Sequence, residues 1–370
     1  MKILFLPVAI GGGHMKTAEA VKEYIDNNFE NAQTMMVDTL KYINPMVDLV
    51  VVGGYLNTIK STPMVYRKLY EMAENTDNLS DFSKTVNQML SFKIKKLVQT
   101  FGPDVIVCTH PFPLQMITTL KRRGKVEAKI MAILTDFAPH SFWHYKEVDT
   151  YIVAHQSVKC EMISRGVNPE IIHPLGIPIS SRFSIDYNKA EIRSRLGLKD
   201  IPTILLMGGS LGFGDIKDIF LALLNCSLNI QTIAVTGKNK RLKTKMEKYA
   251  KDSAKPVKIL GFTDEIPELM SASDFIITKP GGITISEALA KKLPIIIISP
   301  IPGQEEKNAH FLQNNGVAIR IYEKENVELI LKQLFENSLR IRQMVQMAEH
   351  LSKPHAAEDI SKLIRRMCEE

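Results

Sequence analysis

Short apolar runs alternate along the chain with longer segments in which apolar residues recur at helical spacing. Most of the runs are a few residues long and end at a glycine-rich or polar turn, as 203–207 and 275–278 do. Nearly continuous apolar runs such as 294–299 are typical of parallel strands buried on both faces. The pattern predicts an α/β protein with parallel sheets, and further strands are expected over 2–8, 104–108, 129–134, 151–154, 232–236 and 258–261.

The segment 273–308 has the pattern of a strand, a glycine turn, a helix, a second strand and a second helix start. Its helix follows Gly281 and Gly282 directly, so the first backbone N–H groups and the positive end of the helix dipole are open to a ligand. This turn is predicted to seat a diphosphate. The alternative is that Thr284 to Glu287 form a plain capping box and that the glycines only make a tight turn.

The second turn of this segment is polar. After the apolar run, Pro300 to Asn308 place an amide and two carboxylates at the next strand-to-helix turn. Ligands of open α/β sheets bind at the carboxyl ends of the strands. A diphosphate turn beside hydroxyl-binding side chains is what a sugar nucleotide requires.

A histidine and an aspartate are candidates for a general base. His14 ends the turn Gly11-Gly12-Gly13-His14 and stands at the start of a helix expected over 15–29, while Asp136 follows a strand. The turn is not G-x-G-x-x-G, so a dinucleotide fingerprint is not supported. The alternatives are a polar residue near a helix cap for His14 and a loop or N-cap aspartate for Asp136.

Further turns contribute glycines and a lysine. The run Gly208 to Gly214 follows a strand, and its glycines allow close approach to a phosphate or a base. Lys238 is predicted to meet a phosphate, with a solvated basic turn as the alternative. Residues 172–178, punctuated by proline and glycine, resemble a connection between domains, after which the βα pattern starts afresh.

Residues 82–101 carry an amphipathic helical stripe. Its apolar positions are flanked by four lysines: Lys84, Lys93, Lys95 and Lys96. The preferred interpretation is that the stripe packs on a sheet. The other is a basic amphipathic face that helps the protein sit on anionic lipid.

Composition limits the class of protein. The hydrophobic fraction of 45% and charged fraction of 24% are those of a soluble globular protein, and 370 residues suffice for two domains. The four cysteines lie far apart, without a Cys-x-x-Cys pair, which favours a reducing cytosol over disulfides or a zinc site. Residues 1–10 have the pattern of a first strand rather than a signal peptide, and no uncharged apolar run reaches the ~18 residues of a spanning helix.

The net charge is +7, with +2 over residues 1–180 and +5 over the rest. This excess favours anionic partners such as nucleotides or acidic lipid surfaces. It is diffuse along the chain and accompanies no nucleic-acid motif, so no nucleic-acid partner is expected.

The motifs resemble those of a known family. KPGGITISEA at 279–288 and PGQEEKN at 302–308 resemble the donor-binding segment of the family 28 glycosyltransferases. The diacylglycerol branch, with its monogalactosyldiacylglycerol synthases and processive diacylglycerol beta-glucosyltransferases, is the most similar, through GGGH at 11–14, TDF at 135–137 and GGSLGFG at 208–214. The likeness covers nearly the whole chain.

The resemblance implies a GT-B fold, in which two Rossmann-like domains with parallel sheets face each other across a cleft. Residues 1–178 are then the lipid-acceptor domain and 179–352 the UDP-sugar-binding domain, followed by a C-terminal helix at 353–370 that packs back on the first domain. The implied donor contacts are Phe262 with uracil, Glu287 with ribose, Gly281, Gly282 and Thr284 with the diphosphate, and Gln304, Glu305 and Asn308 with the hexose. Gly12, Gly13, Gly209, Ser210 and Lys238 are further expected substrate contacts.

The implied reaction is an inverting transfer of a hexose, glucose in preference to galactose, from a UDP-sugar to diacylglycerol. It needs no cofactor and no metal, since no Asp-x-Asp pair is present to hold a metal-bound diphosphate. His14 or Asp136 is the base, and further sugars can follow the first. The expected location is cytoplasmic, peripheral to the inner face of the cell membrane, with an anionic membrane surface as a partner.

Two alternatives remain open at this point. One is transfer of N-acetylglucosamine from its UDP derivative to a polyprenyl-linked cell-wall precursor, which the short GGGH turn and the QEE triplet disfavour. The other is a non-catalytic UDP-sugar sensor, against which the presence of both His14 and Asp136 argues.

Overall fold

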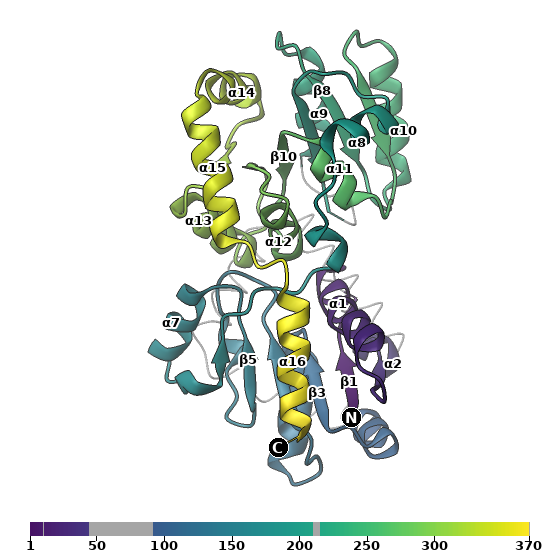
Figure 1. Ribbon diagram of the computed structural model, residues 1–370, viewed down its shortest axis with the longest axis vertical. Coiled ribbons are helices and arrows are strands. Elements are labelled where there is room, and N and C mark those ends of the chain that lie inside the picture. The colour runs from purple at the N-terminus through teal and green to yellow at the C-terminus, as the bar shows by residue number, and fades with distance from the viewer. Residues whose placement is uncertain (10, 44–91, 210–214, 370) are drawn as a thin grey trace. The chain divides into compact units, whose positions relative to one another are not determined.

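The structure is a computed structural model that describes residues 1–9, 11–43, 92–209 and 215–369 (Figure 1). Contacts divide the chain into two compact units. The first unit comprises Met1–Ser181, Pro302–Gln304 and His355–Glu370, and the second comprises Arg182–Ile301 and Glu305–Pro354.

The first unit is built on a six-stranded parallel sheet with the order β2-β1-β3-β4-β5-β6. Its strands are β1 (Lys2–Leu6), β2 (Gln33–Met36), β3 (Val105–Cys108), β4 (Lys129–Ile133), β5 (Thr150–Ile152) and β6 (Ile172–His173). Its helices are α1 (Gly13–Asn28), α2 (Thr39–Ile43), α6 (Pro111–Arg122), α7 (Gln156–Ser164) and α16 (Ala356–Glu369), with short turns η2 (Ser141–Trp143) and η3 (Pro169–Ile171). The short turn η4 (Ser181–Ser184) crosses into the second unit at Arg182. Residues 92–101 are also helical.

Alternate side chains of the central strands fill two cores. Ile3, Phe5 and Val105 pack with α1 and the C-terminal helix α16, whose Ile360 and Ile364 are fully buried. Helix α16 lies along α1 and β3 (Figure 1). On the opposite face, Leu4, Leu6 and Ile106 pack with α6, Trp143 and the helix at 92–101. Both faces are covered, as the continuous apolar strands require.

The second unit repeats this plan with the order β12-β11-β10-β7-β8-β9, again parallel. Its strands are β7 (Thr203–Met207), β8 (Gln231–Val235), β9 (Val257–Leu260), β10 (Phe275–Thr278), β11 (Ile295–Ile297) and β12 (Ala318–Arg320). Its helices are α8 (Lys189–Leu196), α9 (Ile216–Asn225), α10 (Lys240–Lys251), α11 (Ile266–Ala272), α12 (Gly282–Ala290), α13 (Gln304–Asn314), α14 (Val327–Glu336) and α15 (Ser338–Leu351), with the short turn η5 (Lys324–Asn326).

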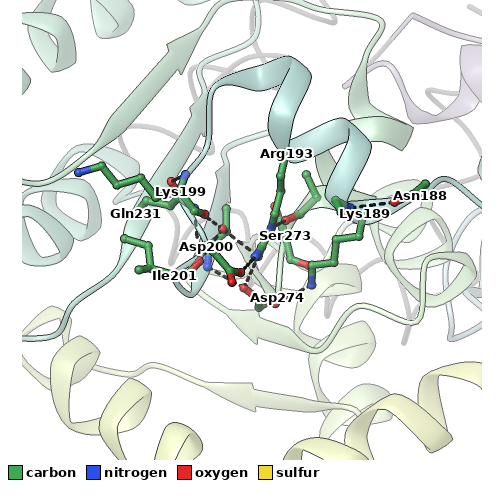
Figure 2. A network of polar contacts seen from close by, with 12 residues as sticks. Asn188, Lys189, Arg193, Lys199, Asp200, Ile201, Gln231, Ser273 and Asp274 are labelled. Atoms are coloured by element: carbon green, nitrogen blue, oxygen red, sulfur yellow. Dashed lines mark hydrogen bonds and ion pairs between the residues drawn. The ribbon is translucent and has the colours of Figure 1, made fainter.

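A polar network fixes the amino ends of the strands in the second sheet (Figure 2). Asp274, just before β10, accepts from the Thr203 N–H at 2.7 Å and pairs with Arg193 of α8 at 2.7 Å. Gln231 at the start of β8 donates to the Lys199 carbonyl at 2.7 Å and to Thr203 Oγ1 at 2.8 Å. These bonds hold three strands in register at one edge, which leaves the opposite, carboxyl edge for ligands.

The predicted strands are confirmed, with differences of at most two residues at either end. Strands β7 and β10 match the predicted bounds, whereas β2, β6 and β12 were not predicted. Residues 172–178, predicted as a connection between domains, begin with β6, which pairs with β5 in the first sheet. Helix α1 begins at Gly13, two residues earlier than predicted, because Gly12 takes the N-cap position.

The stripe predicted over 82–101 is described only from residue 92. There Ile94 and Val98 are buried and Leu97 and Phe101 pack against the core of the first unit, in agreement with the preferred interpretation. Lys93 donates to the Ile43 carbonyl at 2.7 Å. The rest of the stripe, including Lys84, lies outside the described residues.

Candidate active site

The strand order of the first sheet reverses direction between β1 and β3, and the loops that leave these strands meet at its carboxyl edge. Such a switch point is where open α/β sheets bind ligands. The loop after β1 carries Gly11 and Gly12, whose φ angles of 68° and 85° lie in the left-handed region that favours glycine. They turn the chain into α1, so that Gly13 and His14 are the first two helical residues.

His14 is held by residues that follow β3 and β4. Its Nδ1 lies 2.5 Å from the Thr109 carbonyl oxygen and 3.2 Å from Thr135 Oγ1. Because a carbonyl only accepts, Nδ1 carries the proton and Nε2 is left with a lone pair. Thr109 Oγ1 also donates to the His14 carbonyl at 2.9 Å, so the backbone and the ring are fixed together.

A second histidine packs against the first. The rings of His14 and His110 lie 4.7 Å apart, edge to face at 77°. Nδ1 of His110 accepts the Phe112 N–H at 3.0 Å and thereby caps α6, so this ring is neutral with its proton on Nε2. Burial lowers the pKa of His14 to about 4, and burial together with the nearby His14 lowers the pKa of His110 well below its usual value.

Both histidines are therefore uncharged at neutral pH, and the lone pair on His14 Nε2 is available to accept a proton. Asp136, the other predicted base, follows Thr135 directly and is half-buried. The structure thus brings both predicted catalytic residues to the carboxyl edge of the first sheet, His14 after β1 and Asp136 after β4, with β3 between these strands. The His14 ring is fixed in a proton-accepting tautomer.

The second sheet has its own switch point, between β7 and β10. The glycines predicted to bind substrate follow these two strands: Gly209 after β7, with φ 70°, and Gly281 and Gly282 after β10. Helix α12 begins at Gly282, and its N-cap residue Gly281 supplies no side-chain cap. The capping-box alternative is therefore wrong, because Thr284 is the third residue of the helix instead of its N-cap.

The turns after β10 and β11 are tied together by side chains of α13. Asn308 is fully buried and donates through Nδ2 to the Pro280 carbonyl at 3.0 Å. Glu305 accepts from the Ile301 N–H at 2.8 Å and pairs with Lys279 Nζ at 3.1 Å, with both side chains largely buried. Gln304 is the first residue of α13. The amide and the carboxylate predicted to bind a hexose thus also shape the glycine turn.

The remaining predicted donor contacts follow the neighbouring strands. Lys238 comes after β8, and its Nζ lies 5.7 Å from the centroid of the Phe262 ring, which comes after β9 and is 54% exposed. Glu287 is buried within α12. Ser210 lies outside the described residues. Along the carboxyl edge, the order is therefore the turn after β11 with Gln304, the turn after β10 with Gly281 and Gly282, the Gly209 turn, Lys238 and Phe262.

Two residues of these clusters were not predicted as site residues. His110 was visible only as a histidine between a strand end and Pro111, and Lys279 as a lysine before the glycine turn, each without an evident partner.

Among the described residues, no group of three or more His, Cys, Asp or Glu side chains has the geometry of a metal site. No helix in the described ranges has the length and apolarity to span a membrane.

Two parallel sheets, each with a glycine turn at its switch point, define a protein of the GT-B fold. Comparison with solved structures agrees: MurG of Acinetobacter baumannii has a TM-score of 0.66 at 14% identity, with 99% of both chains covered. The Anabaena protein HepE in complex with UDP-glucose has a TM-score of 0.59 at 16% identity, with 99% of this chain and all of that chain covered. At such identities the likeness concerns the fold.

Sequence comparison gives the family. The model for monogalactosyldiacylglycerol (MGDG) synthase matches residues 14–179, and that for the glycosyltransferase family 28 C-terminal domain matches residues 203–364. A processive diacylglycerol beta-glucosyltransferase of Bacillus pumilus is 32% identical over 97% of this chain and 93% of its own length. Its counterpart in Bacillus mycoides is 30% identical over 96% and 91%. The chain belongs to the family 28 glycosyltransferases, in the diacylglycerol branch, and is a glycosyltransferase.

Proposed function

We propose that this protein transfers glucose from UDP-glucose to the hydroxyl of diacylglycerol and forms a β-glycosyl lipid. The similarity over nearly the full length to enzymes named processive diacylglycerol beta-glucosyltransferases supports both the donor sugar and the acceptor. The match of the amino-terminal half to the MGDG synthase model favours diacylglycerol over a cell-wall precursor. The observation that carries the chemistry is His14, whose Nε2 lone pair is set by the bond from Nδ1 to Thr109.

The donor is placed along the carboxyl edge of the second sheet. Phe262 stacks on the uracil, Glu287 accepts from the ribose hydroxyls, and the N–H groups at the start of α12 hold the diphosphate at Gly281, Gly282 and Thr284. Lys238 adds a positive charge on the same edge. Gln304 and Glu305 bind the hexose, whereas Asn308, which is fully buried, holds the Pro280 turn in place.

In the reaction, the acceptor hydroxyl oxygen forms a bond to the anomeric carbon, and the bond from that carbon to the diphosphate oxygen breaks. His14 Nε2 takes the hydroxyl proton, and UDP leaves with the electron pair. The Asp136 carboxylate favours the imidazolium that forms. The dipole and N–H groups of α12 stabilise the leaving diphosphate, so the transfer requires no metal.

A single displacement on an α-linked UDP-sugar inverts the anomeric carbon, and the product is β. The new glucose carries hydroxyls of its own, so the glycolipid serves as a second acceptor and the enzyme acts processively. The enzyme works at the surface of the membrane that contains its acceptor, on the cytoplasmic side where UDP-sugars are made.

The test is a pair of substitutions at the proposed base. In His14→Ala and Asp136→Asn, transfer to diacylglycerol falls by about 10²–10⁴-fold, the range typical of a lost general base, while the affinity for UDP stays unchanged. His350→Ala, at an exposed histidine of α15, is the control and retains full transfer. Turnover that is unchanged in both site variants would remove the assignment of the base.

A further inference from the structure

Helix α10 concentrates the positive charge of the protein. Its twelve residues contain six cations and one acid, a net charge of +5, whereas the whole chain has a net charge of +7. The net charge of residues 181–370 is also +5, so the rest of that half is neutral on balance. The positive charge of this half, which looks evenly spread when only composition is considered, is therefore concentrated in one helix.

The cations of α10 face outward. Met246 is the buried residue of this helix and packs with Leu242 and Ala250 against the core of the second unit, next to α9 and β9. At ~100° per residue, five cations fall on the opposite side within an arc of about 140°. We call this set the basic stripe; it consists of the exposed side chains Lys240, Arg241, Lys245, Lys248 and Lys251.

Nothing in the described part of the chain neutralises the basic stripe. The acid of the helix, Glu247, pairs at 3.3 Å with Lys243, which lies on the flank. No ion pair joins a cation of the stripe to any described carboxylate. Like charges three and four residues apart, such as Arg241 with Lys245 and Lys245 with Lys248, repel each other and disfavour the helix. An external anion is the natural counterpart.

We propose that the basic stripe docks the second unit on an anionic membrane surface. The inference rests in part on the proposed function, because an enzyme whose acceptor is a lipid gains from being held at the bilayer. Helix α10 packs beside β9, the edge strand of its sheet, at the margin of the second unit (Figure 1). The stripe residues and Thr244 between them are all polar, so contact is by charge at the headgroups, without apolar insertion.

This surface differs from the lysine-flanked stripe at 82–101. In the described part of that segment, the stripe residues Ile94, Leu97, Val98 and Phe101 pack into the first unit instead of facing solvent. The basic stripe begins beside the donor edge, because the Lys240 N–H donates to the Lys238 carbonyl at 3.0 Å. Lys245, Lys248 and Lys251, by contrast, lie in the later turns of α10. Removing charge at these three positions therefore leaves in place the residues that are proposed to bind UDP.

The test compares two triple variants with equal change in charge. The stripe variant carries Lys245→Gln, Lys248→Gln and Lys251→Gln. The control variant replaces three exposed cations elsewhere in the second unit by glutamine: Lys332, Arg342 and Lys353. Sedimentation with vesicles of phosphatidylcholine containing about one third phosphatidylglycerol gives the partition coefficient. A cation near such a surface contributes ~1 kcal/mol, so the stripe variant is expected to bind about 100-fold more weakly than wild type.

Wild-type binding is expected to vanish on pure phosphatidylcholine and to weaken steeply with salt, and the control variant is expected to keep most of its binding. Equal losses in the two variants would overturn the proposal, as would binding to neutral vesicles. If the stripe variant lost binding to a duplex oligonucleotide but kept its binding to anionic vesicles, the stripe would be assigned to nucleic acid instead.

Transfer to diacylglycerol in neutral detergent micelles separates this proposal from the proposed function. The stripe variant is expected to match wild type there, since its three positions lie in the later turns of α10, beyond the residues that adjoin Lys238. Absence of transfer by the wild type in micelles would contradict the proposed function and leave the vesicle result standing. If the stripe variant lost transfer to diacylglycerol in micelles as completely as on vesicles, the helix would act in the reaction itself and not in membrane docking.

Discussion

At the scale of single residues, the account depends on His14. Its ring is oriented by a carbonyl and a hydroxyl that lie 95 and 121 positions further along the chain, at Thr109 and Thr135. The sequence placed a histidine at a helix start but gave no sign of these partners, and so left His14 and Asp136 as equal candidates. The tautomer follows from the contact, and the contact follows from strand order, which a residue pattern does not reveal.

The lowered pKa of His14 has a consequence for stability. In the unfolded chain this histidine titrates near 6.5, whereas in the folded protein its pKa is about 4. Between these values the unfolded state binds more protons, so the free energy of unfolding falls as the pH drops from 6.5 towards 4. Above pH 6.5 both states are neutral at this site, and its contribution is constant.

Replacing His14 by Gln keeps a donor for the Thr109 carbonyl and removes the titration. The free energy of unfolding can be measured by urea denaturation at intervals from pH 4 to 7. Its dependence on pH is expected to be shallower in His14→Gln than in wild type, by up to ~1.4 kcal/mol per pH unit. Parallel curves for the two proteins across this range would mean that His14 is not held neutral by the fold.

At the scale of elements, glycine and proline marked the ends of strands most reliably. Strands β7 and β10 end at glycine or proline turns and match their predicted bounds, whereas β2, β6 and β12 are two to four residues long and went unrecognised. The positions of both switch-point turns could be predicted, because each follows an apolar run. The ties between turns, such as Asn308 to Pro280 across 28 residues, could not.

Loss of the Asn308 side chain tests this tie. Asn308→Ala leaves the Pro280 carbonyl without its buried donor, which is expected to lower the free energy of unfolding by about 1–3 kcal/mol. Because the turn that begins α12 is then less well fixed, UDP affinity by calorimetry is expected to fall as well. Asn315→Ala, which removes a partly buried hydrogen bond from the Asn315 amide to the Phe311 carbonyl just after the end of α13, is the control and should spare UDP binding. Equal UDP affinity in the two variants would refute the role given to Asn308.

At the scale of the whole molecule, the alternation of strands and helices predicted an α/β protein, and the motif resemblance predicted the GT-B fold and the family. Both predictions are confirmed by the sheets and by the comparisons. Composition gave the sign of the net charge but hid its location, since a total of +7 does not reveal that α10 carries +5. Strand order and the partners of buried polar groups arise only when distant segments meet.

The central claim is transfer of glucose from UDP to diacylglycerol with inversion and without a metal. The direct measurement incubates the purified protein, with excess chelator, with diacylglycerol vesicles and labelled UDP-glucose or UDP-galactose in parallel, followed by lipid extraction. The account predicts label in the organic phase from UDP-glucose, in a lipid that a β-glucosidase cleaves. Label that requires added metal, an α-linked product, or no lipid label from either donor while UDP still binds would contradict it.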